Sequence, residues 1–226
     1  MNYKVGFYRL DNLFTFFTFA ILFLLPILPT MAQKETEAKK ILDQTSQAFK
    51  ISGGVEADFT LIPYQRGEAL EKITGNIQLK EECFCLKTDA MITWFNGKTQ
   101  WTYLPANEEV NVSNPTREEL ESINPMAFLT LYKEGYSYQL GQRSMFNGEA
   151  VYEVTLSAEN FDKQWANLTL YIDRTTLLPI YIKLKEAGKD YHVITITNYK
   201  QGMNWKIEHF TFNPKEYPDV EVIDLR

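Results

Sequence analysis

The stretch of sequence that decides the fold runs from residue 55 to residue 104 and reads VEADFTLIPYQRGEALEKITGNIQLKEECFCLKTDAMITWFNGKTQWTYL. Apolar and polar residues alternate along it, first over 55–61 and again over 73–80. A period of two places successive side chains on opposite faces of a β-strand. The tripeptide 96–98, Asn-Gly-Lys, is typical of a tight hairpin turn. The stretch therefore predicts consecutive antiparallel strands, each with one apolar face.

Short alternating runs continue to the C-terminal end of the sequence. They predict further strands over residues 109–112, 136–142, 150–157, 167–173, 179–185, 191–199 and 205–212. So many twisted strands cannot form a flat sheet. We therefore predict an α+β, mostly β fold, in which a curled antiparallel sheet of about eleven strands forms a half-open barrel with a helical lid over an apolar concave face.

Helical patterns occur in two places. Residues 35–50 carry apolar side chains at three- and four-residue spacing, and Gly53-Gly54 ends this pattern. In the middle of the strands, residues 117–123 and 126–132 predict a short helical hairpin. The second of these helices is apolar, so we expect it to cover an apolar face.

The first 32 residues differ from the rest. A basic start is followed by an apolar run over 13–28 and by Thr30-Met31-Ala32 before Gln33. This pattern predicts a cleaved secretory signal peptide (1–32) and a single mature domain (33–226). An uncleaved membrane anchor is the alternative, because the apolar run is close to the shortest that spans a bilayer. No Cys follows the run, so we expect no lipid anchor and a protein that is soluble after cleavage.

The composition narrows the class of partner. Lys and Arg number 23 against 29 Asp and Glu, which gives a formal net charge of −6. Neutralising nucleic-acid phosphates requires a basic face, so we expect no nucleic-acid partner.

Cys83 and Cys85 share one face of a strand, too far apart for a disulfide. They predict free thiols in an apolar face, and a metal site with Glu81 and Glu82 is the less favoured alternative.

The sequence contains little that indicates catalysis. It lacks the G-x-S-x-G elbow, the phosphate-binding glycine motifs and H-E-x-x-H. His192 and His209 are its two histidines, and neither lies in a recognisable motif. We therefore predict no enzymatic activity, no catalytic residue, no cofactor and no metal.

The apolar strand faces have two interpretations. They could form an ordinary core, which the pattern alone favours, or a cavity for an acyl chain beneath the lid. The candidate acyl-chain-binding residues are Phe59, Leu61, Ile77, Leu79, Phe84, Leu86, Trp94, Trp101, Tyr103, Phe128 and Leu131.

The order of several motifs resembles a known family. The motifs are VEADFT (55–60), GNIQLK (75–80), NGKTQWTY (96–103), FTFNP (210–214) and VIDLR (222–226), and together they span nearly the whole mature chain. They resemble the periplasmic outer-membrane lipoprotein carriers, the LolA family. One position departs from the family pattern, because Glu81 stands after Lys80 where the family commonly has an Arg that resembles a latch to the lid.

The resemblance implies a function. The protein would be a soluble carrier in the periplasm of a Gram-negative bacterium, where it takes acylated lipoproteins from an inner-membrane lipoprotein-releasing ABC transporter to an outer-membrane acceptor. A carrier whose cavity has a single opening would work as a monomer, so we expect a monomer. Three alternatives remain: a carrier of another lipid, a sensor that uses the same fold, and an enzyme acting on a lipid or glycan. The receptor-type relative LolB is disfavoured, because its lipid-bearing Cys is absent.

Overall fold

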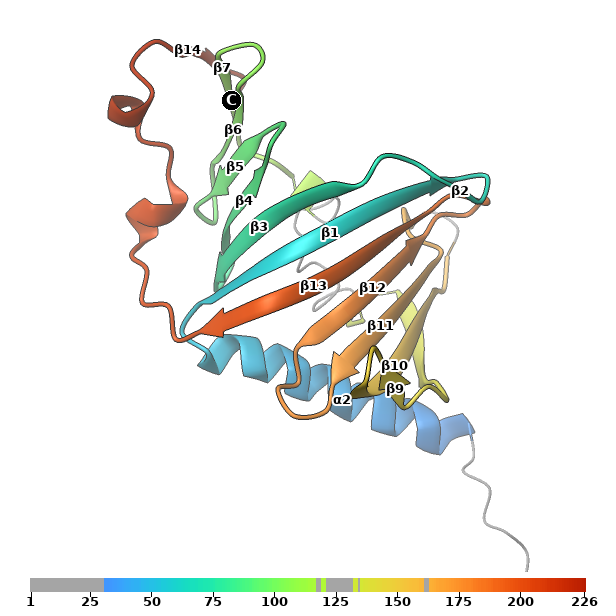
Figure 1. Ribbon diagram of the computed structural model, residues 1–226. Helices are drawn as coiled ribbons and strands as arrows, with labels where there is room; N and C mark the ends of the chain where they lie inside the picture. Colours follow the sequence, from blue (N-terminus) through green and yellow to red (C-terminus); the bar gives the residue numbers. More distant parts are fainter. Residues whose placement is uncertain (1–30, 117–118, 121–131, 134, 161–162) are drawn as a thin grey trace, which may run out of the picture.

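The computed structural model describes residues 31–116, 119–120, 132–133, 135–160 and 163–226 (Figure 1). The elements in chain order are α2 (Met31–Ile51), β1 (Val55–Gln65), β2 (Glu68–Ala69), β3 (Ile73–Lys80), β4 (Cys83–Thr88), β5 (Ile92–Phe95), β6 (Gln100–Leu104), β7 (Glu109–Ser113), β8 (Tyr136–Leu140), β9 (Met145–Phe146), β10 (Glu149–Ala158), β11 (Asn167–Asp173), β12 (Pro179–Lys185), β13 (Tyr191–Gln201), the 3-10 helices η2 (Ile207–Phe210) and η3 (Pro214–Glu216), and β14 (Glu221–Asp224).

The strands form one 14-stranded sheet with the order β14-β7-β6-β5-β4-β3-β1-β13-β12-β11-β10-β8, and β2 and β9 pair beside β1 and β10. The sheet is curled and does not close on itself (Figure 1). The predicted mostly-β, half-open architecture is thereby confirmed. Every pairing is antiparallel except the one between β14 and β7, which is parallel.

The middle of the sheet is formed by two neighbouring strands that are far apart in the sequence. β1 and β13 pair over nearly their full lengths, from Val55 with Gln201 to Tyr64 with Tyr191. Their register shifts beside Asp58, where Asn198 has a φ of 54° and donates a hydrogen bond to the Asp58 carboxylate (2.8 Å). Asn tolerates this left-handed conformation, and a bulge of this kind increases local twist. The bulge therefore contributes to the curl at the middle of the sheet.

Helix α2 crosses one face of the sheet (Figure 1). Its apolar side chains Ala38, Ile41 and Leu42 are buried in a cluster with residues from strands on both sides of β1, so this is the concave face. The helix ends where Gly53 adopts a φ of 74°, a common conformation after a helix C-terminus. The helix predicted over 35–50 is confirmed. Because α2 begins at Met31, it includes two residues of the predicted signal peptide, and cleavage stays a prediction.

A second apolar cluster lies on the opposite face of β4–β7. It comprises Cys85, Trp94, Val110 and Val112, covered by residues of the C-terminal segment 203–220. The strand predicted over 205–212 is wrong, because this segment forms η2 and an irregular run instead. The aromatic side chains of this segment alternate because they pack onto the second cluster of the sheet. Its backbone forms no strand. We call residues 203–220 the C-terminal strap.

No helix among the described residues is both long and apolar enough to cross a lipid bilayer.

Candidate functional site

The concave face gathers the candidate residues of β1, β3 and β4. Cross-strand pairs set their common side: Phe59 pairs with Gly75 and Ile196, and Leu79 pairs with Phe84. Ile77, Leu79 and Phe84 are buried in the concave cluster, whereas Phe59 and Leu86 are partly buried against it. Leu61 is half-buried and pairs with Ile194, which packs on the same cluster. These six predicted residues therefore share one apolar face.

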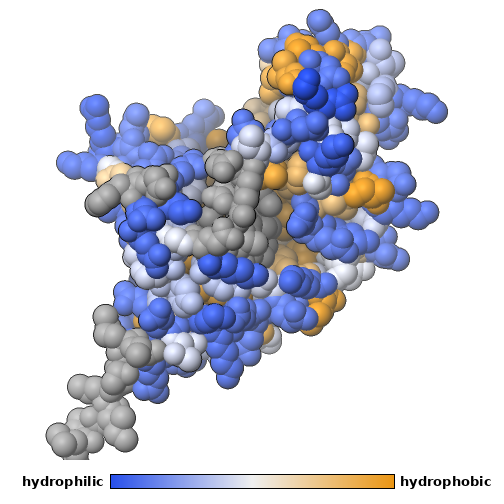
Figure 2. All heavy atoms as spheres, turned by 180° about the vertical axis from the view of Figure 1, so that it is seen from behind, coloured by the Kyte–Doolittle hydropathy of each residue, from blue (hydrophilic) through white to orange (hydrophobic). Residues whose placement is uncertain are grey.

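The second half of the chain completes this face. Buried side chains from β10, β11 and β12 join the same cluster: Val154, Leu156, Leu168, Leu170, Ile172 and Ile182. Several large side chains are only partly buried against it: Tyr138, Leu140, Tyr152, Trp165, Leu184, Ile194 and Tyr199. Apolar side chains gather in the hollowed part of this side of the molecule (Figure 2). A ligand could contact the partly buried set without displacing the fully buried one.

On the concave face, a hydrogen bond joins two segments that are far apart in the sequence. The hydroxyl of Tyr132 donates a hydrogen bond to Asp43 of α2 (2.7 Å), and Asp43 also pairs with Lys39 (2.7 Å). Burial and the Asp43 carboxylate raise the pKa of Tyr132 above its usual range, and the two hydrogen bonds lower the pKa of Asp43. Tyr132 belongs to residues 114–135, which connect β7 and β8 near opposite ends of the sheet order.

The beginning of that connection has a defined helix start. The backbone N–H of Glu119 donates to the Thr116 hydroxyl (3.2 Å), and the Glu119 carboxylate accepts from the Thr116 backbone N–H (2.7 Å). This reciprocal pair is a capping box. Leu120, in the same helical turn, packs against the concave cluster. Most of the predicted helical hairpin lies outside the described residues, as do its candidate ligand contacts Phe128 and Leu131.

Three candidate residues are not on the concave face. Trp94, Trp101 and Tyr103 belong to the second cluster, beneath the C-terminal strap. The prediction assumed that Trp94 continues the face of Phe84, but Phe84 pairs with Phe95, and Trp94 pairs with Cys85. The connection between β4 and β5 sets this register, and a shift of one residue exchanges the two faces. Trp94, Trp101 and Tyr103 therefore do not share the concave face with the other candidates.

The strap holds these aromatic residues in place. The ring of Trp94 lies 5.7 Å from that of Phe212, and the ring of Tyr103 lies 4.9 Å from that of Tyr217. Cys83 and Cys85 are part of this cluster and form no disulfide, which confirms the predicted thiols in an apolar face. Burial raises the pKa of Cys85 to about 11.

Residues 28–188 match the family model described as outer membrane lipoprotein carrier protein LolA. This chain belongs to the LolA family. The matched span includes α2 and every strand from β1 to β12. β13, the strap and β14 lie beyond it. Comparison with curated proteins finds no match.

Solved structures are similar to this chain at low sequence identity. An uncharacterized conserved protein from Thermus thermophilus has a TM-score of 0.58 and 15% identity, over 83% of this chain and 99% of that chain. A LolA superfamily protein from Nitrosomonas europaea has a TM-score of 0.44 and 10% identity, over 77% and 97%. MucB in the MucA/MucB complex from Pseudomonas aeruginosa has a TM-score of 0.41 and 13% identity, over 79% of this chain and 62% of that chain.

Three polar side chains of this LolA-family fold lie in different surroundings. Glu81, at the position of the family Arg, lies exposed in the β3–β4 turn with a φ of 54°. His209 stacks on Trp205 in the strap and lies 2.7 Å from the Gln78 amide oxygen, and burial lowers its pKa. His192 is on the concave face, where its ring contacts Trp165. The two histidines therefore lie on opposite faces of the sheet.

Sequence reasoning omitted several partly buried concave residues from its candidates. Leu184 could have been found, because it follows Ile182 by two positions in a predicted strand. Trp165 could not, because it precedes β11 and alternation does not extend to it.

Proposed function

We propose that this protein is a carrier that shields the acyl chains of lipoproteins on its concave face. The observation that carries the proposal is the partly buried apolar set on that face, which includes Phe59, Leu86, Leu184 and Ile194. Each methylene removed from water stabilises the bound chain by about 0.8 kcal/mol. Aliphatic and aromatic walls contact an acyl chain without reading its polar part, so many different cargo proteins could bind.

Family membership supports the cellular route. The carrier would act as a monomer in the periplasm of a Gram-negative bacterium. It would take lipoproteins from an inner-membrane ABC transporter and pass them to an outer-membrane acceptor, without catalysing a reaction. The second candidate is a carrier of another acylated lipid. The same apolar surface favours it, because apolar side chains contact an acyl chain and do not recognise a protein attached to it.

A release assay tests the proposal. Purified protein is added to spheroplasts, and the supernatant is probed for acylated lipoproteins. Release by the wild type supports a lipoprotein carrier. Absence of release, together with lipid bound to the purified protein in mass spectrometry, would favour the second candidate.

A matched pair of variants links release to the concave face. Leu86→Glu places a charge on that face, whereas Ile92→Glu places the same charge on the neighbouring strand but in the second cluster. Both side chains are half-buried, so the two changes have comparable effects on folding. We expect Leu86→Glu to abolish release and Ile92→Glu to retain it. Equal release by both variants would contradict the site.

A further inference from the structure

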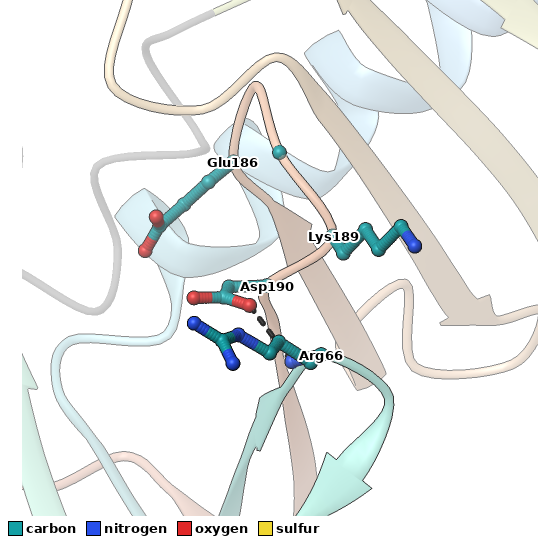
Figure 3. A pocket seen from close by; sticks show the side chains of 5 residues that line it. Arg66, Glu186, Lys189 and Asp190 are labelled. Carbon is teal, nitrogen blue, oxygen red and sulfur yellow. Dashed lines mark hydrogen bonds between the residues drawn. The ribbon is translucent and has the colours of Figure 1, made fainter.

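A polar pocket lies where two hairpin turns meet. It has a volume of about 370 Å³ and is lined by Arg66 of the β1–β2 turn and by Glu186, Gly188, Lys189 and Asp190 between β12 and β13 (Figure 3). Pockets of roughly 300–1,000 Å³ commonly hold small ligands. The pocket therefore has room for a polar group of several atoms.

The two turns are fixed relative to each other. The backbone N–H of Arg66 donates a hydrogen bond to the Asp190 carboxylate (2.9 Å). At the adjacent strand ends, the rings of Tyr64 and Tyr191 stack at 4.4 Å with an interplanar angle of 11°. Both contacts bridge segments far apart in the sequence. The charged side chains are thus presented by an ordered junction.

The pocket offers charges of both signs. The guanidinium of Arg66 and the carboxylates of Glu186 and Asp190 extend to one side, whereas Lys189 extends away from them (Figure 3). Among the described residues, Arg66 forms no ion pair within 4 Å. A guanidinium binds a phosphate through two parallel N–H groups, and carboxylates accept hydrogen bonds from an ammonium. The arrangement suits a ligand that carries both groups.

A short series of contacts connects the pocket to the concave face. The Glu186 carboxylate lies 3.5 Å from His192 Nε2, and the His192 ring packs edge-on against Trp165 at 5.5 Å. Trp165 packs on the concave cluster, as does Leu184, which pairs with His192. A polar group in the pocket is therefore adjacent to the apolar surface that would hold an attached acyl chain.

We infer that the pocket binds the head of a zwitterionic phospholipid, with its phosphodiester on Arg66 and its primary ammonium on Glu186 and Asp190. The lipid's acyl chains occupy the concave face, so the inference rests on the acyl-chain site of the proposed function. It extends the ligands of that site from lipoproteins to an aminophospholipid.

The test uses vesicles that contain equal amounts of dioleoyl phosphatidylethanolamine, phosphatidylcholine and phosphatidylglycerol. The purified full chain is incubated with them and reisolated, and its bound lipids are counted by mass spectrometry. Since hydrogen bonds to charged groups are strong, we expect phosphatidylethanolamine to be enriched about tenfold over the other two lipids. Enrichment of phosphatidylglycerol instead would show an anion site and overturn the inference.

Variants localise the selectivity. Arg66→Gln and the double change Glu186→Gln/Asp190→Asn should each reduce the enrichment to about onefold to threefold, while total bound lipid is retained. Lys98→Gln and the double change Glu81→Gln/Glu82→Gln make the same charge changes in exposed turns at the other end of the β3 and β4 strands, and should keep the enrichment. Enrichment that survives both pocket variants would overturn the inference.

A fluorescent fatty acid separates the two proposals. If it binds to wild type but phosphatidylethanolamine is not enriched, the head site is wrong and the acyl-chain site stands. If it does not bind at all, the acyl-chain site is wrong and the head site is overturned with it.

Discussion

The ring of Phe59 lies across Gly75 on the neighbouring strand. A Cβ atom on Gly75 would stand 2.6 Å from Phe59 Cζ and would also meet the backbone oxygen of Lys87. The two residues are direct cross-strand partners on the concave face. An aromatic ring that covers a strand glycine compensates for its missing side chain. Gly75 thus sets the position of one of the large candidate ligand contacts.

Gly75→Ala should therefore destabilise the fold and displace Phe59. Overpacking of this kind costs about 1–3 kcal/mol. In a domain of this size, that lowers the melting temperature by about 2–4 °C for each kcal/mol, measured by thermal unfolding. Gly188→Ala is the control, because a Cβ there has nothing within 4 Å. An unchanged melting temperature for Gly75→Ala would show that Phe59 and the strand backbone at Lys87 both move away from the added methyl group.

The two faces of the sheet should differ in acyl-chain binding. Phe59→Ser removes a partly buried ring from the concave face, and Tyr103→Ser removes a half-buried ring from the second cluster. We expect a fluorescent fatty acid to bind Phe59→Ser about tenfold more weakly, since an aliphatic or aromatic contact contributes about 1.5–3 kcal/mol when fully buried. Tyr103→Ser should bind as wild type. A titration in which Tyr103→Ser shows the larger loss would return the site to the face beneath the strap.

The contact between Tyr132 and Asp43 should contribute stability that depends on pH. The folded pKa of Asp43 is lowered, first by the hydrogen bond from Lys39 and then by that from Tyr132. A lowered folded pKa stabilises the protein above the ordinary Asp pKa, 3.8 here, and this contribution disappears as the pH falls through the folded value. Tyr132→Phe should cost about 1 kcal/mol of unfolding free energy at pH 7.

Urea unfolding at pH 7 and at pH 3 measures this effect. The difference between wild type and Tyr132→Phe should be smaller at pH 3, because below 3.8 the Asp43 carboxyl group of the unfolded chain binds a proton and the stabilisation from the lowered folded pKa begins to be lost. Ser137→Ala, which removes an exposed hydroxyl with a long 3.4 Å hydrogen bond, should change little at either pH. A Tyr132→Phe cost that grows on acidification would mean that the ionised carboxylate is not the acceptor.

The C-terminal strap should protect Cys85. Phe210 is 1% exposed and packs in the cluster that contains this thiol, so Phe210→Ala should cost about 3–5 kcal/mol. Burial also raises the pKa of Cys85 to about 11, which leaves little reactive thiolate at pH 8. In a Cys83→Ser background, we expect slow reaction with a thiol reagent for the parent and a reaction at least tenfold faster for Phe210→Ala. Equal rates would show that the strand itself, and not the strap, shields the thiol.

Local patterns in the sequence predicted most of the strands and the exact bounds of a few of them. Asn167–Asp173 and Pro179–Lys185 were predicted with the bounds that the structure has, because alternation and flanking turn residues are properties of neighbouring positions. Helix α2 was found for the same reason, since its buried residues recur at helical spacing. The LolA family resemblance rested on the order of such local motifs.

Only the tertiary structure decided which apolar face each strand presents to which partner. Trp94 and Phe84 lie on opposite faces because the register across the β4–β5 connection is fixed by pairing and not by alternation within either strand. Residues 205–212 alternate like a strand, yet they cover the second cluster of the sheet and form no strand. Alternation shows which side chains are buried, and it does not show whether the backbone pairs with a neighbouring strand. The pairing of β1 with β13, and the polar pocket where their ends meet the concave face, join residues more than a hundred positions apart, and no local pattern carries that information.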